Sequence, residues 1–338
     1  MKNRNCLFNF LKEEELMPNS PVKAFLLDKK GSSLELSYDE LENINNEDKI
    51  LWVHFDYSSK EAIDWITNKS GIDSVAIDAL LTEETRPRTT ILGEALLIAL
   101  RGVNLNPNSK PEDMISIRLY ISPNLIISTR KRNLLSVDEI IDDLKNSKGV
   151  KSSAEFLVEL TRKVTDRMDM VIDEIQDRTD LLEENFIDSE NTEYRSEILA
   201  IRRETIVLKR YLTPQKDALI KLYNEKISWI DEYQRIELRE TNDQLMRHIE
   251  ELDTIRDKVI LIQEELANSM NEQLNKKMYM LSIISAIFLP LTFLTGLLGI
   301  NIGGIPGAEN ENAFYVFIII LFIVITLQFF IFKKKKWL

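Results

Sequence analysis

Sulfur and imidazole side chains are scarce in this chain. One cysteine, Cys6, and two histidines, His54 and His248, occur among 338 residues. A single cysteine excludes a disulfide within the chain, and so few Cys and His side chains exclude a tetrahedral structural zinc site. The sequence also lacks a glycine-rich phosphate loop and the HExxH and GxSxG motifs. We therefore expect no enzymatic activity of those kinds and no resident cofactor.

Basic residues are fewer than acidic residues in this chain. The chain has 55 Asp and Glu against 43 Lys and Arg, for a formal net charge of −12. A surface of that sign argues against a nucleic-acid partner and attracts cations. Residues 1–19 hold no long apolar run and include three consecutive glutamates, so we expect no secretory signal there.

Glycine is absent between residues 150 and 295, and Pro214 is the only proline of that stretch ahead of the apolar C-terminal end. This texture predicts long helices at 152–187, at 191–224 and from about 231 onward. Apolar residues recur along the third helix mostly three, four or seven apart, at Leu238, Leu245, Ile249, Leu252, Val259, Ile262, Leu266, Met270 and Leu274. The 29 acidic and 20 basic residues of 151–277 form either an ordinary solvated surface or a negative mouth that concentrates cations.

Two uncharged apolar stretches, residues 278–300 and 313–332, stand near the C-terminus. Each has about the 20 residues that a helix needs to cross a bilayer. Lys276 and Lys277 precede the first stretch, four lysines follow the second, and the loop between them holds no Lys or Arg. The positive-inside rule then predicts that both termini are cytoplasmic and that the loop is external.

The first 150 residues alternate between β-rich and helical patterns. We expect strands at 21–27, 50–57, 95–103, 114–122 and 125–131, the last three as a meander, and helices at 59–69 and 73–83. The predicted organisation is an N-terminal cytoplasmic α/β domain (1–150), a helical region (151–230), a stalk helix that continues into the first membrane span (231–300), an external loop (301–312), a second span (313–332) and a basic tail (333–338).

The tripeptide Gly299-Ile300-Asn301 resembles the Gly-Met-Asn signature of the CorA family of divalent-cation transporters. Isoleucine in place of methionine, followed by GGIPG at 303–307, is similar to the ZntB branch, whose members carry Gly-(Val/Ile)-Asn and a GGIPG loop. The segments LLTEETRPR (80–88), LRGVNLNP (100–107), PEDMISIRLYI (111–121) and KKKKWL (333–338) also resemble this family, so the resemblance runs from about 21 to 338.

The resemblance implies a CorA-like homopentameric funnel with an α+β cytoplasmic domain, in the plasma (inner) membrane of a prokaryote. Asn301 would place five amides at the outer mouth, where they hold a hydrated ion; the alternative is that Asn301 caps its helix. Helical spacing and the signature together predict further pore-lining residues at Asn275, Met278, Leu281, Ser285, Thr292 and Thr295. The hydroxyls of Ser285 and Thr292 either face the pore or bond to carbonyls of their own helix. Glu309 and Glu311 either attract cations on the external side of the membrane or belong to an ordinary solvent-exposed loop.

The transported ion is the open point. The resemblance implies zinc uptake, with proton coupling as one alternative, although no side chain of the predicted pore is an obvious proton carrier. Without His or Cys ligands, the pore should discriminate poorly among Zn²⁺, Co²⁺, Ni²⁺, Cd²⁺ and Mg²⁺. The family's regulatory metal site aligns with Asp78–Ala79 and Glu240, and the alanine leaves Mg²⁺ sensing open. A CorA-type magnesium/cobalt channel and a non-transporting coiled-coil scaffold remain as alternatives.

Overall fold

The structure is a computed structural model that describes residues 21–43, 49–83, 86–184, 192–299, 307 and 310–335. It divides into two compact units, residues 1–261 and 262–338. The division falls within the longest helix, α7 (Glu232–Leu298), so one continuous helix contributes to both units. A single helix thus runs without a break from Glu232 to Leu298, whereas its division into a stalk and a membrane span stays a prediction.

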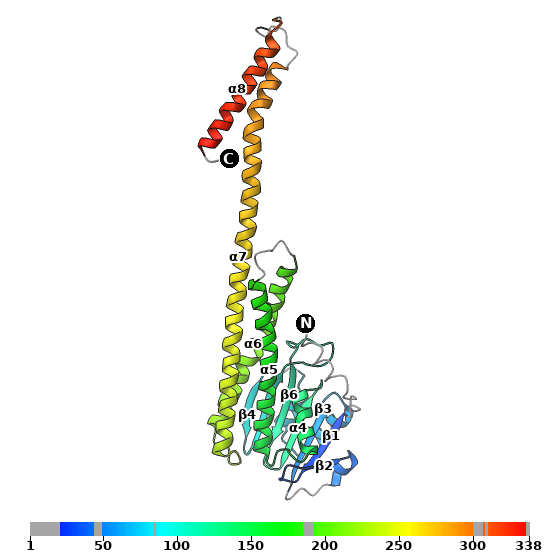
Figure 1. The fold of residues 1–338 in the computed structure, drawn as a ribbon. Coiled ribbons are helices and arrows are strands. Elements are labelled where there is room, and N and C mark those ends of the chain that lie inside the picture. Colours follow the sequence, from blue (N-terminus) through cyan, green and yellow to red (C-terminus); the bar gives the residue numbers. More distant parts are fainter. Residues whose placement is uncertain are drawn as a thin grey trace. The chain divides into compact units, whose positions relative to one another are not determined.

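A seven-stranded mixed sheet lies at the centre of the first unit (Figure 1). Its order is β2-β1-β3-β7-β6-β5-β4, and all neighbours are antiparallel except β3 and β7, which run parallel. The predicted meander is confirmed as β5, β6 and β7. The strands are β1 (Val22–Leu27), β2 (Ser33–Leu36), β3 (Ile50–Asp56), β4 (Arg88–Leu92), β5 (Ala95–Gly102), β6 (Ile115–Ile121) and β7 (Leu125–Arg130).

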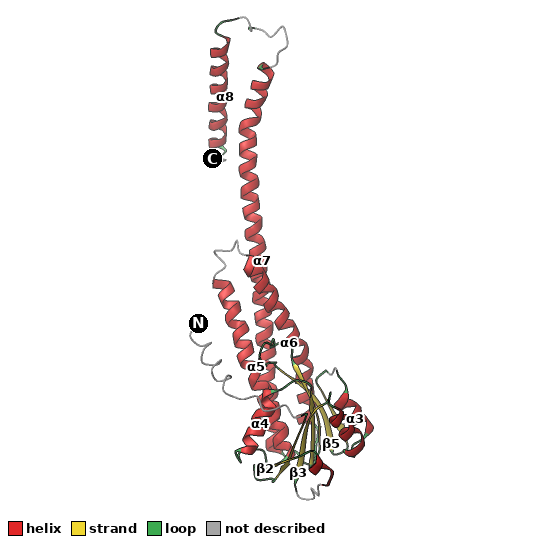
Figure 2. Cartoon of the chain, turned by 90° about the vertical axis from the view of Figure 1, so that its right-hand side faces the viewer, coloured by secondary structure: helices red, strands yellow, loops and turns green. Residues whose placement is uncertain are grey.

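Helices cover both faces of this sheet (Figure 2). Side chains alternate along β3, so its aromatic residues pack on opposite faces. On one face Phe55 contacts Trp65 with ring centroids 5.3 Å apart, and on the other Trp52 contacts Phe156 at 4.8 Å. Trp65 begins a short π-helix, η2 (Trp65–Lys69), which follows α2 (Lys60–Asp64) and precedes α3 (Ser74–Leu81); Phe156 belongs to α5 (Ser153–Glu184). The helices α4 (Leu135–Lys145) and α6 (Thr192–Asn224) lie beside α5, so the unit has three layers, with the sheet between two layers of helices. A 3-10 turn, η1 (Asp39–Asn43), precedes β3.

A buried polar chain crosses the two parallel strands. The indole N–H of Trp52 donates to the hydroxyl of Ser128 at 2.9 Å, and His54 Nδ1 lies 2.7 Å from the same oxygen. Arg130 Nε donates to His54 Nε2 at 2.6 Å, so the imidazole must be neutral to accept this bond. Burial lowers the pKa of His54 well below its usual range, and the charges of Arg130 and Lys23 lower it further.

Buried side chains of α7 follow a seven-residue repeat over its first half. Leu238, Leu245, Leu252 and Val259 are buried at one position of the repeat. Three residues after each lies a second buried set: Thr241, His248, Ile255 and Ile262. The predicted apolar stripe is thus confirmed as far as Leu266 except at Ile249, which is only partly buried, whereas Met270 and Leu274 are 44% and 56% exposed. From residue 267 to its end at Leu298, no residue of α7 is buried.

The second unit contains the end of α7 and the helix α8 (Ala313–Lys334). Both helices include windows long and apolar enough to cross a membrane, with mean hydropathies of 2.1 and 2.9. The helix α8 continues beyond the predicted second span, so Lys333 and Lys334 of the predicted tail are helical. The resulting helix pair carries all the described residues that were predicted to line a pore.

Candidate functional site

The two helices of the second unit contact each other through one face each. On α8 the more covered side chains recur three or four residues apart: Ala313, Phe317, Leu321, Val324, Gln328 and Phe332. On α7 the more covered side chains are Ile283, Ala286, Ile287, Pro290, Leu291 and Leu294. Figures 1 and 2 both show α8 alongside the end of α7, in agreement with this pattern. The contact uses one side of α7 and leaves the other side open.

The predicted pore-lining residues lie on the open side of α7. Ser285 is two residues from both Ile283 and Ile287, which places it about 160° around the helix from each. Thr292 has the same relation to Pro290 and Leu294. Both hydroxyl residues are therefore exposed and face away from α8.

Seven-residue spacing joins these residues into one stripe. Met278, Ser285, Thr292 and Gly299 are seven apart, and Leu281 and Thr295 follow members of that set by three. Met278 and Leu281 are 67% and 65% exposed. We call this set the open stripe: Met278, Leu281, Ser285, Thr292, Thr295 and Gly299. Asn275, three residues before Met278, is also exposed but lies at the margin of the stripe.

The hydroxyl groups of the stripe differ in their partners. Thr295 Oγ1 donates within its own helix, to the carbonyls of Leu291 at 3.0 Å and Thr292 at 3.1 Å. The side chains of Ser285 and Thr292 make no hydrogen bond to any other described residue. The alternative considered for Ser285 and Thr292 was a hydrogen bond to a carbonyl of their own helix. Neither residue makes such a bond, whereas Thr295 does. Two rings of hydroxyls remain available if several copies of α7 surround an axis.

Gly299 stands where α7 ends, and its lack of a side chain matters there. Its N–H donates to the carbonyl of Thr295 at 2.9 Å, and a Cβ built on Gly299 would lie 2.8 Å from that same oxygen. Real Cβ atoms do not approach a backbone oxygen so closely, so any side chain would displace the helix end. Three predicted site residues, Ile300, Asn301 and Glu309, lie outside the described residues. Glu311 is exposed next to a turn in which Asn310 N–H donates to the Gly307 carbonyl.

The predicted cytoplasmic pair, Asp78 and Glu240, is exposed on α3 and α7. The backbone carbonyl of Asp78 accepts bonds from the N–H and hydroxyl of Thr82, while its carboxylate remains at the surface. Within the described ranges no group of three His, Cys, Asp or Glu side chains is placed to bind a metal ion. A regulatory site at these residues stays a prediction.

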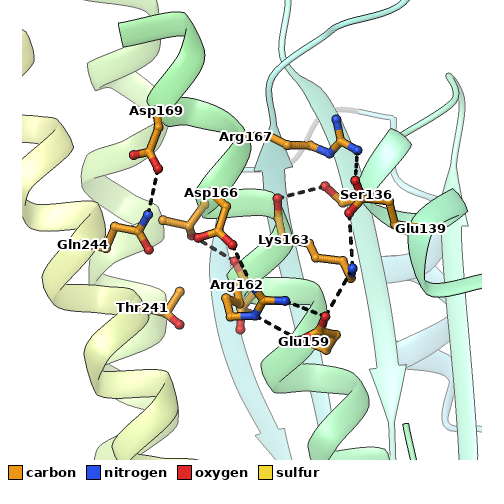
Figure 3. Close-up of polar contacts among 12 residues, drawn as sticks. Ser136, Glu139, Glu159, Arg162, Lys163, Asp166, Arg167, Asp169, Thr241 and Gln244 are labelled. Atoms are coloured by element: carbon orange, nitrogen blue, oxygen red, sulfur yellow. Dashed lines mark hydrogen bonds and ion pairs between the residues drawn. The ribbon is translucent and has the colours of Figure 1, made fainter. Parts of the chain in front are cut away.

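A charged network that the sequence did not indicate lies on α5 (Figure 3). Arg162 bonds Glu159 and Asp166, each at 2.7 Å, and Lys163 lies 3.3 Å from Glu159 and 3.1 Å from Asp143 of α4. Burial alone would raise the pKa of Glu159, but hydrogen bonds and charge from Arg162 and Lys163 lower it overall. The network fixes α5 against α4 and has the character of structural ion pairing.

The first half of α7 is held to α5 by a second polar contact (Figure 3). His248 is only 3% exposed, and its Nε2 bonds the carboxylate of Asp169 on α5. Gln244 Nε2 donates to the other oxygen of that carboxylate at 3.2 Å. The contact places a polar histidine inside the otherwise mostly apolar stripe of α7.

Comparison with known sequences gives several extensive matches. A family model described as CorA-like Mg²⁺ transporter protein matches residues 47–334. The divalent cation transporter CmaX of Pseudomonas aeruginosa is 40% identical over 290 residues, which span 85% of this chain and 87% of that protein. The zinc transport protein ZntB of Pectobacterium carotovorum subsp. carotovorum is 34% identical over 325 residues, spanning 96% of this chain and 98% of that protein.

Solved structures give matches of similar extent. The structure of full-length CmaX has a TM-score of 0.82 and 35% identity, and it covers 94% of this chain and 99% of that one. The CorA magnesium transporter of Methanocaldococcus jannaschii has a TM-score of 0.80 over 95% of this chain and 100% of that one. Its identity is 18%, so this likeness shows a shared fold alone.

Proposed function

We infer the function of this chain from one premise: it belongs to the CorA family of divalent-cation transporters, as Gly299-Ile300-Asn301 predicted. It is therefore a membrane transporter of divalent cations and not an enzyme. Within that function we propose zinc uptake of the ZntB kind, through a homopentamer with Asn301 at the outer mouth. The full-length match to zinc transport proteins supports this choice of ion.

The observation that carries the proposed pore is the open stripe on α7. Its Ser285 and Thr292 hydroxyls have no partner among the described residues and face away from the second span. Lipid would leave these polar groups unsatisfied, which is unfavourable in hydrocarbon. A ring of α7 helices instead turns both hydroxyls toward water on a central axis, with α8 outside. One copy cannot enclose such an axis, so the stripe supports self-association.

The chemistry of the stripe favours passage of a partly hydrated ion. Its polar atoms are hydroxyl oxygens, and Met278 adds a weakly ligating thioether. Hydroxyl and amide oxygens accept hydrogen bonds from the water around Zn²⁺ or Mg²⁺ without binding the metal strongly enough to hold it. A row of carboxylates would bind more tightly and release more slowly. Lysines on both flanks of the helix pair support cytoplasmic termini and an external loop.

A CorA-type magnesium/cobalt channel is the second candidate. The matching family model is described by magnesium, and a pore with oxygen ligands and no His or Cys suits a hard cation. The CmaX relative is named only for divalent cations, so it favours neither ion. Proton coupling is proposed only as an accompaniment to zinc uptake.

Metal flux into proteoliposomes tests the proposal. Zn²⁺ and Mg²⁺ entry is measured with and without an inward pH gradient, for the wild type, Asn301→Ala and Asn312→Ala. Asn312 precedes α8 and makes no side-chain capping bond, so it is a matched control in the same loop. We expect Zn²⁺ flux that falls at least tenfold in Asn301→Ala and persists in the control. Strong Mg²⁺ flux that internal Mg²⁺ blocks would favour the second candidate. Wild-type metal entry no faster than in liposomes without protein, and unchanged in Asn301→Ala, would favour the non-transporting scaffold.

A further inference from the structure

Pro290 interrupts the hydrogen-bond ladder of α7 inside the predicted first span. A proline has no N–H, so the carbonyl four residues earlier, that of Ala286, receives no bond from position 290. The proline ring also crowds that carbonyl and pushes it away from the helix axis. In hydrocarbon an unpaired carbonyl costs several kcal/mol, so it needs a donor from elsewhere.

The second span supplies a donor at this position. Gln328 is the only polar side chain among the six covered residues of α8. Its Nε2 lies 3.5 Å from the carbonyl oxygen of Ala286, a long hydrogen bond between the two helices. Its amide oxygen is buried without a partner among the described residues. The side chain thus lies against α7 at the carbonyl that Pro290 leaves free.

At position 328 an apolar side chain would cost less free energy than a buried glutamine without a hydrogen-bond partner. The other covered residues of α8 are Ala, Phe, Leu, Val and Phe, any of which packs against α7 without desolvating an amide. A glutamine in an apolar helix contact is unfavourable unless it satisfies a polar group of the neighbouring helix. The carbonyl of Ala286 is such a group, because Pro290 offers it no N–H. Ala286 and Pro290 both lie on the side of α7 that α8 covers.

We propose that Gln328 is a positioning residue for transport: it donates to the Ala286 carbonyl that Pro290 leaves without an N–H partner, and so fixes the second span against the pore-lining helix at this level. The second span then sets how Ser285 and the residues beyond Pro290 are oriented. This role rests on the proposed function only where it concerns flux; the hydrogen bond and its effect on the helix pair do not depend on transport.

A double-mutant cycle between positions 290 and 328 tests this role. Gln328→Leu removes the donor, and Pro290→Ala restores the backbone N–H that pairs with Ala286 internally. In the wild-type background we expect Gln328→Leu to lower the thermal unfolding midpoint in nanodiscs. We also expect it to reduce Zn²⁺ flux by about threefold to fifteenfold, which is the factor that corresponds to the free energy of a hydrogen bond between membrane helices. In Pro290→Ala the same substitution should change flux less than about twofold.

The matched control is Thr326→Val on the same helix. Its hydroxyl bonds the Phe322 carbonyl of α8 itself, and its side chain is exposed on another face. We expect this variant to keep wild-type flux and unfolding midpoint. Gln328→Glu provides a conservative rescue: a neutral carboxylic acid donates to the carbonyl, whereas a carboxylate cannot. Its flux relative to the wild type should fall as pH rises.

Equal effects of Gln328→Leu in both backgrounds would overturn the proposal. If Pro290→Ala does not fold, the pH profile decides alone, because a constant ratio of Gln328→Glu to wild-type flux would also overturn it. Should the wild type move no divalent cation, the proposed function fails, but the cycle in unfolding midpoints still supports or rejects the Gln328 contact. The two failures are therefore distinguishable.

Discussion

Removing Asp169 should destabilise the first unit through a histidine seventy-nine residues away. His248 is buried on α7, its Nε2 bonds Asp169, and its Nδ1 has no partner among the described residues. Asp169→Ala therefore leaves both ring nitrogens unpaired, and one newly unpaired buried group costs about 1–3 kcal/mol. Because the Asp169 side chain is 50% exposed, water enters part of the vacated space. We expect the free energy of unfolding to fall by about 1–2 kcal/mol.

The companion variant is His248→Leu, which places an apolar side chain in the buried repeat of α7. It removes the polar nitrogens together with their need for a partner, so we expect a change below about 1 kcal/mol. In the double variant, loss of Asp169 should then cost little more. Urea unfolding of the full-length protein, followed by emission from buried Trp52 and Trp65, measures all four free energies. Additive effects, or a wild-type midpoint for Asp169→Ala, would refute this reasoning.

Two further predictions concern pH and the end of α7. The pKa of His54 is lowered well below 6.5 by burial and by Arg130 and Lys23, whereas unfolding restores it to about 6.5. The unfolded chain thus binds the extra proton, so stability is complete above pH 6.5 and falls below it by up to about 1.4 kcal/mol per pH unit. The slope of unfolding free energy between pH 6.5 and 5.5 should be smaller in His54→Gln, and equal slopes would contradict this. Gly299→Ala should reduce metal flux, because the added Cβ would lie 2.8 Å from a backbone oxygen, which costs about 1–3 kcal/mol of conformational free energy. The control is Gly296→Ala, whose Cβ meets nothing within 4 Å and should leave the flux unchanged.

Much of the fold followed from apolar patterns, and what was missed has a physical reason. Five strands and the long helices have strong, regular signals. The strands β2 and β4 lie at the two edges of the sheet, and their sequences SLEL and RTTIL lack the apolar runs of central strands. The helix α4 had a usable signal in Val137, Ile140, Ile141 and Leu144, spaced three, one and three apart. The parallel pairing of β3 with β7 joins segments far apart in sequence, which local patterns do not encode.

The candidate site was predictable to a similar degree. The residues of the open stripe follow from seven-residue spacing, but the face that α8 covers depends on helix packing. The predicted stripe on the first half of α7 included Ile249, whereas the buried residue is its neighbour His248. A polar residue in that place makes sense only once Asp169 on another helix is seen to pair with it. Gln328 was missed for the same reason, since its partner is a carbonyl 42 residues earlier.

Thiol accessibility along α7 tests the central claim that the open stripe faces an ion pathway. Cys6 is the only cysteine, so Cys6→Ser gives a background without thiols. Ser285→Cys and Ile287→Cys are then compared, because they lie on opposite sides of the same helix turn. A water-soluble cationic thiol reagent should block metal flux through the Ser285→Cys protein and leave the Ile287→Cys protein active. Block of the Ile287→Cys protein, with no effect on Ser285→Cys, would contradict the account.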